Sequence, residues 1–318
     1  MTPYAPAAAL PLPRVWDPLL EVIQSHPRYE EPFVRCIGQL FYGEGPLRVQ
    51  ERHYVALMAA SRHRCSFMVN LFEREFEACG GELGWLKGLA ACSQKRMQHL
   101  DEMNRLLAHQ PWLFVAEDIR VKDGNGGDSP TTAGDGSLLQ SFQRFTNNLA
   151  FTYVDFYTST RNDTTKTFNL HEFSWDQHGY MILEEQYQEL IAKLDDKFNL
   201  TQTLTYKTMG EYTDVDTSSY RMAVWNYIQA LFGIRHDDYD YSEVNTMLSK
   251  EMKTFIKTVA CYPHRVTEAL RTSVMTDFKN SEKVHVMLMV MEARLQSELL
   301  YFTRTLTNYD RLERTMLC

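Results

Sequence analysis

Apolar residues recur at helical intervals along most of this chain. Their spacing of three and four residues predicts helices with one buried face, whereas strands would show strict alternation. The Gly80-Gly81 pair predicts the end of the longest helix in the first half, because glycine readily takes the left-handed conformation found at helix C-termini. The helices predicted in the first half cover 15–24, 32–41, 51–79 and 93–109.

The second half shows the same helical spacing. Its last predicted helix is apolar on nearly every face, which is typical of a helix buried in a core. Residues 138–151 favour a short helix, and residues 153–168, rich in threonine and aromatic side chains, favour an extended segment. No segment has the alternation of a sheet, so the predicted fold class is all-α. The helices predicted here cover 181–198, 218–232, 242–260, 267–278 and 281–306.

A change of composition divides the chain in two. The stretch KDGNGGDSPTTAGDG, which begins at Lys122, has no large apolar side chain and cannot contribute to a core. We interpret it as a flexible linker between two helical lobes. The predicted divisions are a disordered N-terminus (1–14), an N-terminal helical domain (15–121), a disordered linker (122–137), a C-terminal helical domain (138–310) and a tail (311–318).

Composition and charge are those of an ordinary soluble protein. Of the 318 residues, 44% are hydrophobic and 23% are charged. The net charge of -8 disfavours binding to nucleic acid or to an anionic membrane surface. The six cysteines form no CxxC pair, which is typical of reduced intracellular thiols. Because the N-terminus lacks the regions of a signal peptide and no apolar run reaches the ~20 residues of a membrane helix, we expect a cytoplasmic protein, with the nucleus as a second location.

Sequence motifs for common chemistry are absent. The chain has no glycine-rich phosphate loop and no Gly-x-Ser-x-Gly nucleophile motif. The pair His53 and His63, like the pair Asp176 and His178, lacks the spacing of zinc ligands. We therefore expect neither a cofactor nor a metal.

Two charged residues stand among strongly apolar segments of the second half. Arg221 follows Thr217 in one predicted helix, and Glu282 begins the last one. A buried cation and a buried anion without an obvious nucleophile suit the capture of a zwitterion better than the breaking of a bond. In the structural alternative, Arg221 pairs with Asp214 or Asp216 on the surface. Glu282 then only stabilises the N-terminus of its helix.

Cys65 is a candidate nucleophile. It is predicted to lie in the middle of the helix over 51–79, directly after the run Arg62-His63-Arg64. Nearby cations lower the pKa of a thiol, so one interpretation is a peroxidatic thiolate. The other is a buried structural cysteine, which is the commoner role of an unpaired thiol.

Several segments resemble the sestrin family. The run RHYVALMAASRHRCSFMVNLF, from Arg52, is similar to the N-terminal domain of sestrins, which is itself similar to alkyl hydroperoxidase D. The second half resembles the sestrin C-terminal domain through HEFSWDQHGY, LTYKT, WNYIQALFGIRHDDYDYSEVN, IKTVACYP and SEKVHV. The resemblance covers Val15 to Ile119 and Phe168 to Asn308. It implies two helical lobes of related, alkyl hydroperoxidase D-like architecture, the first of them shortened by a helix or two.

The resemblance bears on the chemistry of Cys65. In sestrins this cysteine is followed by a tyrosine and a histidine that relay protons, and the present chain has Phe67 and Phe72 at those positions. Phenylalanine neither donates nor accepts a proton. We therefore expect no peroxide reduction through this relay, and a thiol-dependent alkyl hydroperoxide reductase using Cys65 stays the alternative function.

The resemblance also implies an amino-acid pocket. By position, Arg221 would bind the carboxylate of leucine and Glu282 its ammonium group. Met275 stands where the family has a tryptophan in the pocket floor, and its adaptable side chain predicts weaker affinity or looser selectivity. The other pocket residues implied are Thr205, Tyr206 and Thr208 in a lid, Thr217, and the latch His26.

An acidic-aromatic loop supplies a candidate contact surface. In sestrins the aspartates that match Asp237 and Asp238 contact a GATOR complex, a regulator of the Rag GTPases. The alternative is a solvated turn whose acids favour the dipole of the following helix. Together these features predict a leucine or amino-acid sensor that inhibits TOR complex signalling through a GATOR-type partner in the stress and nutrient response.

Overall fold

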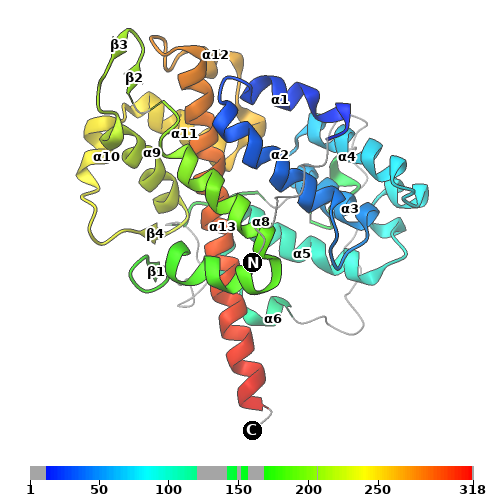
Figure 1. The fold of residues 1–318 in the computed structure, drawn as a ribbon. Coiled ribbons are helices and arrows are strands. Elements are labelled where there is room, and N and C mark those ends of the chain that lie inside the picture. Colours follow the sequence, from blue (N-terminus) through cyan, green and yellow to red (C-terminus); the bar gives the residue numbers. More distant parts are fainter. Residues whose placement is uncertain (1–11, 120–141, 149–151, 157–167, 206, 317–318) are drawn as a thin grey trace, which may run out of the picture.

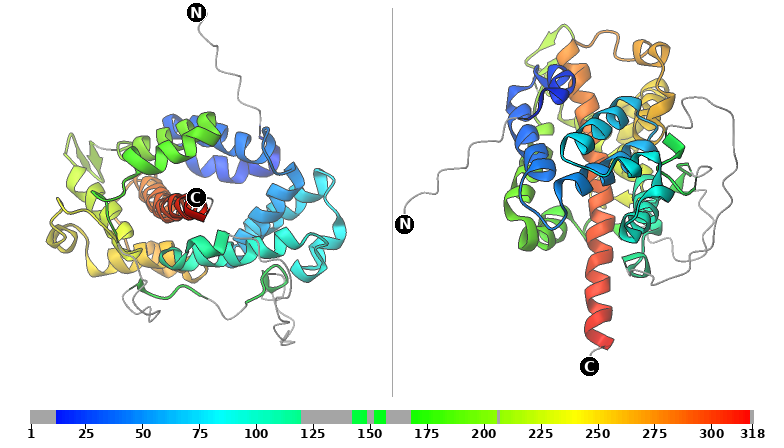
Figure 2. Two further views of the ribbon diagram at one scale, coloured as in Figure 1. Left: turned by 90° about the horizontal axis from the view of Figure 1, so that it is seen from below. Right: turned by 90° about the vertical axis from the view of Figure 1, so that its right-hand side faces the viewer.

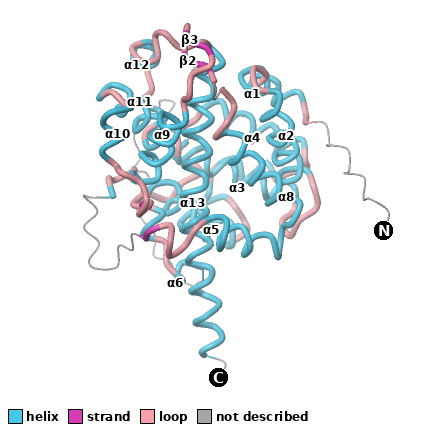
Figure 3. The backbone as a smooth tube through the Cα atoms, turned by 60° about the vertical axis from the view of Figure 1, so that its left-hand side comes forward, coloured by secondary structure: helices cyan, strands magenta, loops and turns pink. Residues whose placement is uncertain are grey.

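Helices make up nearly all of the described structure, which confirms the predicted all-α class (Figure 1, Figure 3). The computed structural model describes residues 12–119, 142–148, 152–156, 168–205 and 207–316, the side chains of 312–316 excepted. The predicted linker 122–137, half of the predicted helix 138–151 and most of the predicted extended segment 153–168 lie outside these residues, as does Tyr206.

The helices follow the predicted periodicity closely. Those of the first half are α1 (Asp17–Ile23), α2 (Pro27–Tyr42), α3 (Val49–Arg62), α4 (Ser66–Ala78), α5 (Lys95–His109) and α6 (Ala116–Ile119). Those of the second half are α8 (Tyr180–Thr201), α9 (Ser218–Leu231), α10 (Ser242–Met247), α11 (Lys250–Cys261), α12 (Glu268–Thr272) and α13 (Asn280–Met316). Short 3-10 turns cover Arg14–Trp16, Leu83–Lys87, Leu89–Ala91, Pro111–Leu113 and Pro263–Arg265, and a π-helical turn, Trp175–Gly179, precedes α8.

The predicted long helix over 51–79 is wrong, because it is broken into α3 and α4. Arg64 has φ 53°, the left-handed conformation. The N–H of Cys65 donates to the carbonyl of Ala60 at 3.1 Å, and that of Arg64 donates to Ser61 at 3.0 Å. These two bonds form a Schellman motif with arginine where glycine is usual. Cys65 is therefore the N-cap residue directly before α4, not one in mid-helix.

Two other predicted helices are shorter than expected. The segment 242–260 is divided into α10 and α11, because Ser249 has an extended backbone and its Oγ accepts the N–H of Met252, which starts a new helix. The segment 267–278 is helical only at α12 (Glu268–Thr272), and beyond it Met275 has φ 54°. By contrast, α2 begins earlier than predicted, at Pro27, because proline suits the first position of a helix.

Two strand pairs of two residues each were not predicted. β1 (Phe168–Asn169) lies parallel to β4 (Ile234–Arg235), and β2 (Thr208–Met209) is antiparallel to β3 (Tyr212–Thr213). The β2–β3 hairpin lies at the end of the molecule beside α12 (Figure 1, Figure 3). Segments this short carry no alternation that a sequence pattern could reveal.

The last helix, α13, is the axis of the second half. In the view along its length, α13 runs inside a ring formed by the other helices (Figure 2). It packs mainly on α8 and α9, and also on α11. Its middle is largely buried, as predicted, except on the face of Met287 and Met291, which are 39% and 41% exposed. Its C-terminal part extends beyond the other helices (Figure 1).

The buried apolar side chains form three clusters. The largest surrounds α13 and includes Trp112 and Phe114 from the first half of the chain. A second lies around α3 and α4, and a third joins the first turns of α2 to Leu288 of α13. Two buried ion pairs accompany these cores. Arg62 meets Asp101 at 2.6 Å, and Lys197 of α8 meets Glu292 of α13 at 2.9 Å.

No helix in the described part of the chain is both long and apolar enough to cross a membrane. Within the same residues, no cluster of three histidine, cysteine or acidic side chains could hold a metal ion.

Candidate functional site

The predicted pocket residues come from the ends of several elements. Glu282 lies in the first turn of α13, Arg221 in the first turn of α9, and Thr208 in the β2–β3 hairpin. Thr205 follows α8, and His26 directly precedes α2. The chain links between them are long, so only tertiary packing brings these groups to one end of α13.

Glu282 is the most constrained of these groups. Its side chain is buried, and its Oε2 accepts the N–H of Gly210 at 2.8 Å and of Lys279 at 2.9 Å. Burial alone would raise the pKa of Glu282, but these hydrogen bonds and one from Thr208 outweigh it and lower the pKa. The carboxylate is therefore ionised. Its other oxygen, Oε1, is buried and has no hydrogen-bond partner among the described residues.

Gly210 permits this arrangement. It has φ 62°, a left-handed conformation that favours glycine. A Cβ at this position would lie 2.5 Å from the carbonyl oxygen of Asp277, so no other residue fits without movement of the backbone. The hairpin turn thus lies directly on the segment that leads into α13, with its N–H group aimed at Glu282.

Arg221 is held from two sides. Its Nε donates to the carbonyl of Gln202 at 2.6 Å, just beyond the end of α8, and a terminal nitrogen donates to Oγ1 of Thr217. Burial lowers the pKa of the guanidinium, against the opposing effect of Asp216. The two acids that could pair with Arg221 on the surface, Asp214 and Asp216, both have other contacts. Asp216 accepts the N–H of Ser218, and Asp214 lies 4.0 Å from Lys207.

A further buried residue, His285, contacts Thr205 and the end of α8, and it was not predicted from the sequence. It lies one turn after Glu282 on α13 and is 2% exposed. Its Nδ1 lies 2.6 Å from Oγ1 of Thr205, and its Nε2 lies 2.6 Å from the carbonyl oxygen of Thr201. Both Arg221 and Glu282 act on its pKa. The signal was available, because a residue three positions after Glu282 shares its helix face.

His26, the residue that the resemblance implies as a latch, lies beside the first turn of α13. His26 is buried, and its Nε2 lies 2.8 Å from the carbonyl oxygen of Ser281, the residue before Glu282. Its ring lies 6.0 Å from that of His285. Met275 is half-buried against the core around α13.

Buried histidines make stability sensitive to acid. Burial lowers the pKa of His53 and His285 to about 4 and that of His109 to about 3, from 6.5. Between pH 6.5 and pH 4 the unfolded chain binds more protons than the folded one, so acid favours unfolding. From pH 7 to pH 5 we expect each histidine to cost roughly 2 kcal/mol of unfolding free energy. Urea unfolding at both values measures the loss, and equal stabilities would contradict it.

The acidic loop lies apart from the pocket, after β4 and beyond the other end of α9. Asp237 and Asp238 are exposed, and Asp237 pairs with His171, which is also exposed. The loop is ordered from within, because the N–H of His236 donates to the hydroxyl of Tyr241 at 3.1 Å. The His236 ring also contacts Oε1 of the buried Gln229, at 2.7 Å. The aspartates are thus presented to solvent on a fixed loop.

A groove of about 720 Å³ adjoins this loop, between α9, α10 and α11. Among the described residues, five cations and three tyrosines line it and no carboxylate does, in a chain of net charge -8. Acidic and basic surfaces therefore meet at this face. The charged and aromatic lining residues are Arg235, Lys250, Lys253, Lys257, Arg265, Tyr227, Tyr241 and Tyr262.

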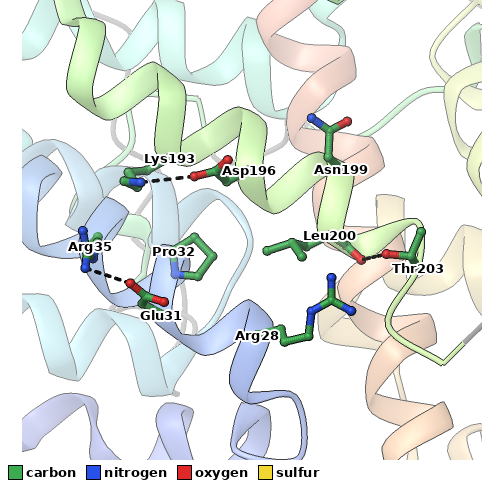
Figure 4. Close-up of a pocket in the computed structure, with 9 residues that line it drawn as sticks. All are labelled: Arg28, Glu31, Pro32, Arg35, Lys193, Asp196, Asn199, Leu200 and Thr203. Atoms are coloured by element: carbon green, nitrogen blue, oxygen red, sulfur yellow. Dashed lines mark hydrogen bonds and ion pairs between the residues drawn. The ribbon is translucent and has the colours of Figure 1, made fainter. Parts of the chain in front are cut away.

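A second hollow, of about 480 Å³, lies between α2 and α8 (Figure 4). Its charges are largely satisfied within it. Arg35 pairs with Glu31 at 2.8 Å, and Lys193 pairs with Asp196 at 3.2 Å. Arg28 lies at its edge beneath Leu200 (Figure 4). Such mutual pairing leaves little charge for a ligand.

Cys65 lies at the α3–α4 turn, away from the pocket. Its thiol is half-buried and forms no disulfide. The two positions of the relay differ in environment, because Phe67 is 43% exposed whereas Phe72 is buried. Phe72 packs against Trp16 and Phe41, with ring centroids 5.9 and 5.2 Å away.

Comparison with known proteins gives the family. The chain matches the family described as PA26 p53-induced protein (sestrin) over residues 8–129 and 125–310. It is 30% identical to Sestrin-1 of Mus musculus over 412 aligned residues, covering 92% of this chain and 83% of the relative. It is 31% identical to Sestrin-2 of Homo sapiens over 404, covering 92% and 84%. These alignments are longer than the 318 residues of the chain, so the relatives contain segments that it lacks. The chain belongs to the sestrin family.

Proposed function

We propose that this chain is a cytoplasmic amino-acid sensor whose ligand is leucine or a similar aliphatic amino acid, and that it inhibits TOR signalling through a GATOR-type partner. Membership of the sestrin family supports a sestrin-like role in the stress response. The proposal adds a ligand and a partner to that role.

One observation carries the choice of ligand. Oε1 of the ionised Glu282 is buried without a hydrogen-bond partner among the described residues. An unpartnered charged oxygen in the interior is costly, and an ammonium group is the partner that would satisfy it. The charges of Arg221 and Glu282 both affect the pKa of His285. Arg221 supplies the positive charge that a ligand carboxylate needs. A free amino acid carries both groups.

Thermal unfolding with L-leucine tests this proposal. A ligand that binds only the folded protein stabilises it by about 4 kcal/mol at a thousand times its dissociation constant. We expect leucine to raise the melting temperature and its D-enantiomer to have a much smaller effect. With both charged groups held by Arg221 and Glu282, the D-enantiomer would direct its side chain away from the apolar floor at Met275. No shift with leucine, isoleucine or methionine would contradict the proposal.

The acidic loop is proposed as the partner surface. Replacing both Asp237 and Asp238 with lysine should abolish co-purification with the GATOR-type complex, because the exposed negative charges on this fixed loop would become repulsive. Leucine-dependent stabilisation should stay unchanged. A matched control is the reversal of two other exposed acids, Glu185 and Glu189 of α8.

Undiminished co-purification of the doubly reversed variant would show that the loop is only a solvated turn. Loss of both partner binding and leucine response would instead indicate misfolding. The groove beside the loop supports a protein partner through its two arginines and three tyrosines, since arginine and tyrosine are enriched at protein interfaces.

We do not extend the proposal to peroxide reduction by Cys65. Neither Phe67 nor the buried Phe72 can pass a proton to or from the thiol. A peroxidase assay of the Cys65→Ser variant beside the unaltered chain would measure any activity of that thiol.

A further inference from the structure

A hydrogen-bonded chain runs from the proposed lid into the core. The Thr205 hydroxyl lies 2.6 Å from Nδ1 of His285, and Nε2 of the same ring lies 2.6 Å from the carbonyl oxygen of Thr201. Thr201 is the last residue of α8 and is fully buried. His285 therefore joins three segments: the base of the lid, the end of α8 and the start of α13.

The chemistry of these contacts fixes the tautomer of His285. A carbonyl oxygen only accepts, so Nε2 must carry the proton that it donates to Thr201. In a neutral imidazole Nδ1 then has the lone pair, and the Thr205 hydroxyl donates to it. Burial keeps the ring neutral, since it lowers the pKa of His285 to about 4. Each group in these hydrogen bonds is therefore assigned as either donor or acceptor.

The series of hydrogen bonds continues along the interface of α8 and α13. The Thr201 hydroxyl donates to the carbonyl of Lys197 at 2.7 Å, one turn earlier on α8. The Lys197 ammonium meets Glu292 at 2.9 Å, and the Tyr29 hydroxyl of α2 donates to the same Glu292 oxygen. All of these side chains are buried. The end of α8 is thus fixed to both α13 and α2.

We propose that His285 is the positioning residue of the amino-acid site, which fixes the base of the lid by accepting the Thr205 hydroxyl while it is itself held by the end of α8. This inference rests on the proposed function for its ligand. His285 lies one turn of α13 away from Glu282 and is not proposed to contact the ligand itself. It acts on the site through Thr205.

Two substitutions separate the halves of this bridge. An asparagine amide at position 285 lies where Nδ1 was and can accept from Thr205, whereas a glutamine amide reaches the place of Nε2 and can donate to Thr201. We expect His285→Asn to bind L-leucine within about threefold of the unaltered chain and His285→Gln to bind roughly tenfold more weakly, the effect of one lost buried hydrogen bond. Thr205→Val should weaken binding as much as His285→Gln does.

The double variant gives a sharper test. Thr205→Val combined with His285→Gln should bind no more weakly than either alone, because both remove the same bond. Thr203→Val is the matched control, since this exposed hydroxyl donates only to Leu200 at 3.3 Å, and it should bind as the unaltered chain does. Equal weakening by His285→Asn and His285→Gln, or additive effects in the double variant, would overturn the inference.

Hydrogen exchange without ligand keeps this test independent of the proposed function. If the unaltered chain binds no leucine, the sensor proposal fails, but the bridge still predicts faster amide exchange over 203–210 in His285→Gln than in His285→Asn. The same exchange rate in both variants would overturn the inference whatever the ligand.

Discussion

Replacing Glu282 with glutamine is expected to abolish the response to leucine. The amide would keep an oxygen for the N–H groups of Gly210 and Lys279, which the carboxylate accepts at 2.8 and 2.9 Å. It would lose the charge that an ammonium group needs, and its NH₂ group would face that ammonium group. Loss of one partner of a buried charge pair costs 2–5 kcal/mol or more, roughly 30-fold to several thousandfold in affinity.

Calorimetric titration of the Glu282→Gln variant with L-leucine measures this loss directly. The matched control is Glu268→Gln, which removes the charge of an exposed glutamate that pairs with Arg271 on the surface. That variant should bind leucine as the unaltered chain does, because exposed pairs contribute little. A Glu282→Gln variant with full affinity would show that Glu282 serves only the N-terminus of its helix and the hairpin above it.

Replacing Asp101 with alanine should have the largest effect on stability. Asp101 accepts from Arg62 at 2.6 Å and from the N–H of Asn147 at 3.0 Å, and both side chains of the pair are 2% exposed or less. Without Asp101 the guanidinium stays buried with no carboxylate to pair it. Removing one partner of a buried pair in this way destabilises a protein by about 3–5 kcal/mol. Urea unfolding at neutral pH measures the difference.

The neighbouring residue provides the control. Glu102 follows Asp101 on α5 and pairs with Arg105, but its side chain is 53% exposed. Glu102→Ala should therefore cost less than about 1 kcal/mol, as surface pairs do. A loss for Asp101→Ala as small as that for Glu102→Ala would contradict the prediction and would mean that water reaches Arg62.

The double variant Asp101→Leu with Arg62→Met should recover much of the lost unfolding free energy, because it leaves no buried charge.

The helices were predictable because their pattern is local. The spacing of apolar residues located α5, α8, α9 and α13 to within a few residues, except that α13 continues to Met316, and Gly80-Gly81 marked the end of α4. The break at Arg64 was not predictable, because an arginine takes the place of the usual glycine. Besides its two local hydrogen bonds, this turn has a long-range contact directly before it. Arg62, at the end of α3, pairs with Asp101, 39 residues away.

The candidate site, too, was predicted only in part from the sequence. Residue type alone identified Arg221 and Glu282 as opposite charges among apolar segments, and the resemblance assigned them to two ends of an amino acid. Sequence reasoning did not find His285, although it stands in the quoted run SEKVHV. Its spacing of three residues from Glu282 places it on the same helix face, but what it binds depends on the segments that it faces in the fold.

The all-helical class, the approximate course of most helices and the identity of the charged groups can be predicted from local pattern, because each depends on neighbours within a few residues. How those groups are used depends on the folded arrangement. It brought Gly210 onto Glu282 across 72 residues and Thr205 onto His285 across 80. It also left one buried oxygen of Glu282 without a partner among the described residues. Hydrogen bonding and burial depend on separations in space, which a linear pattern does not contain.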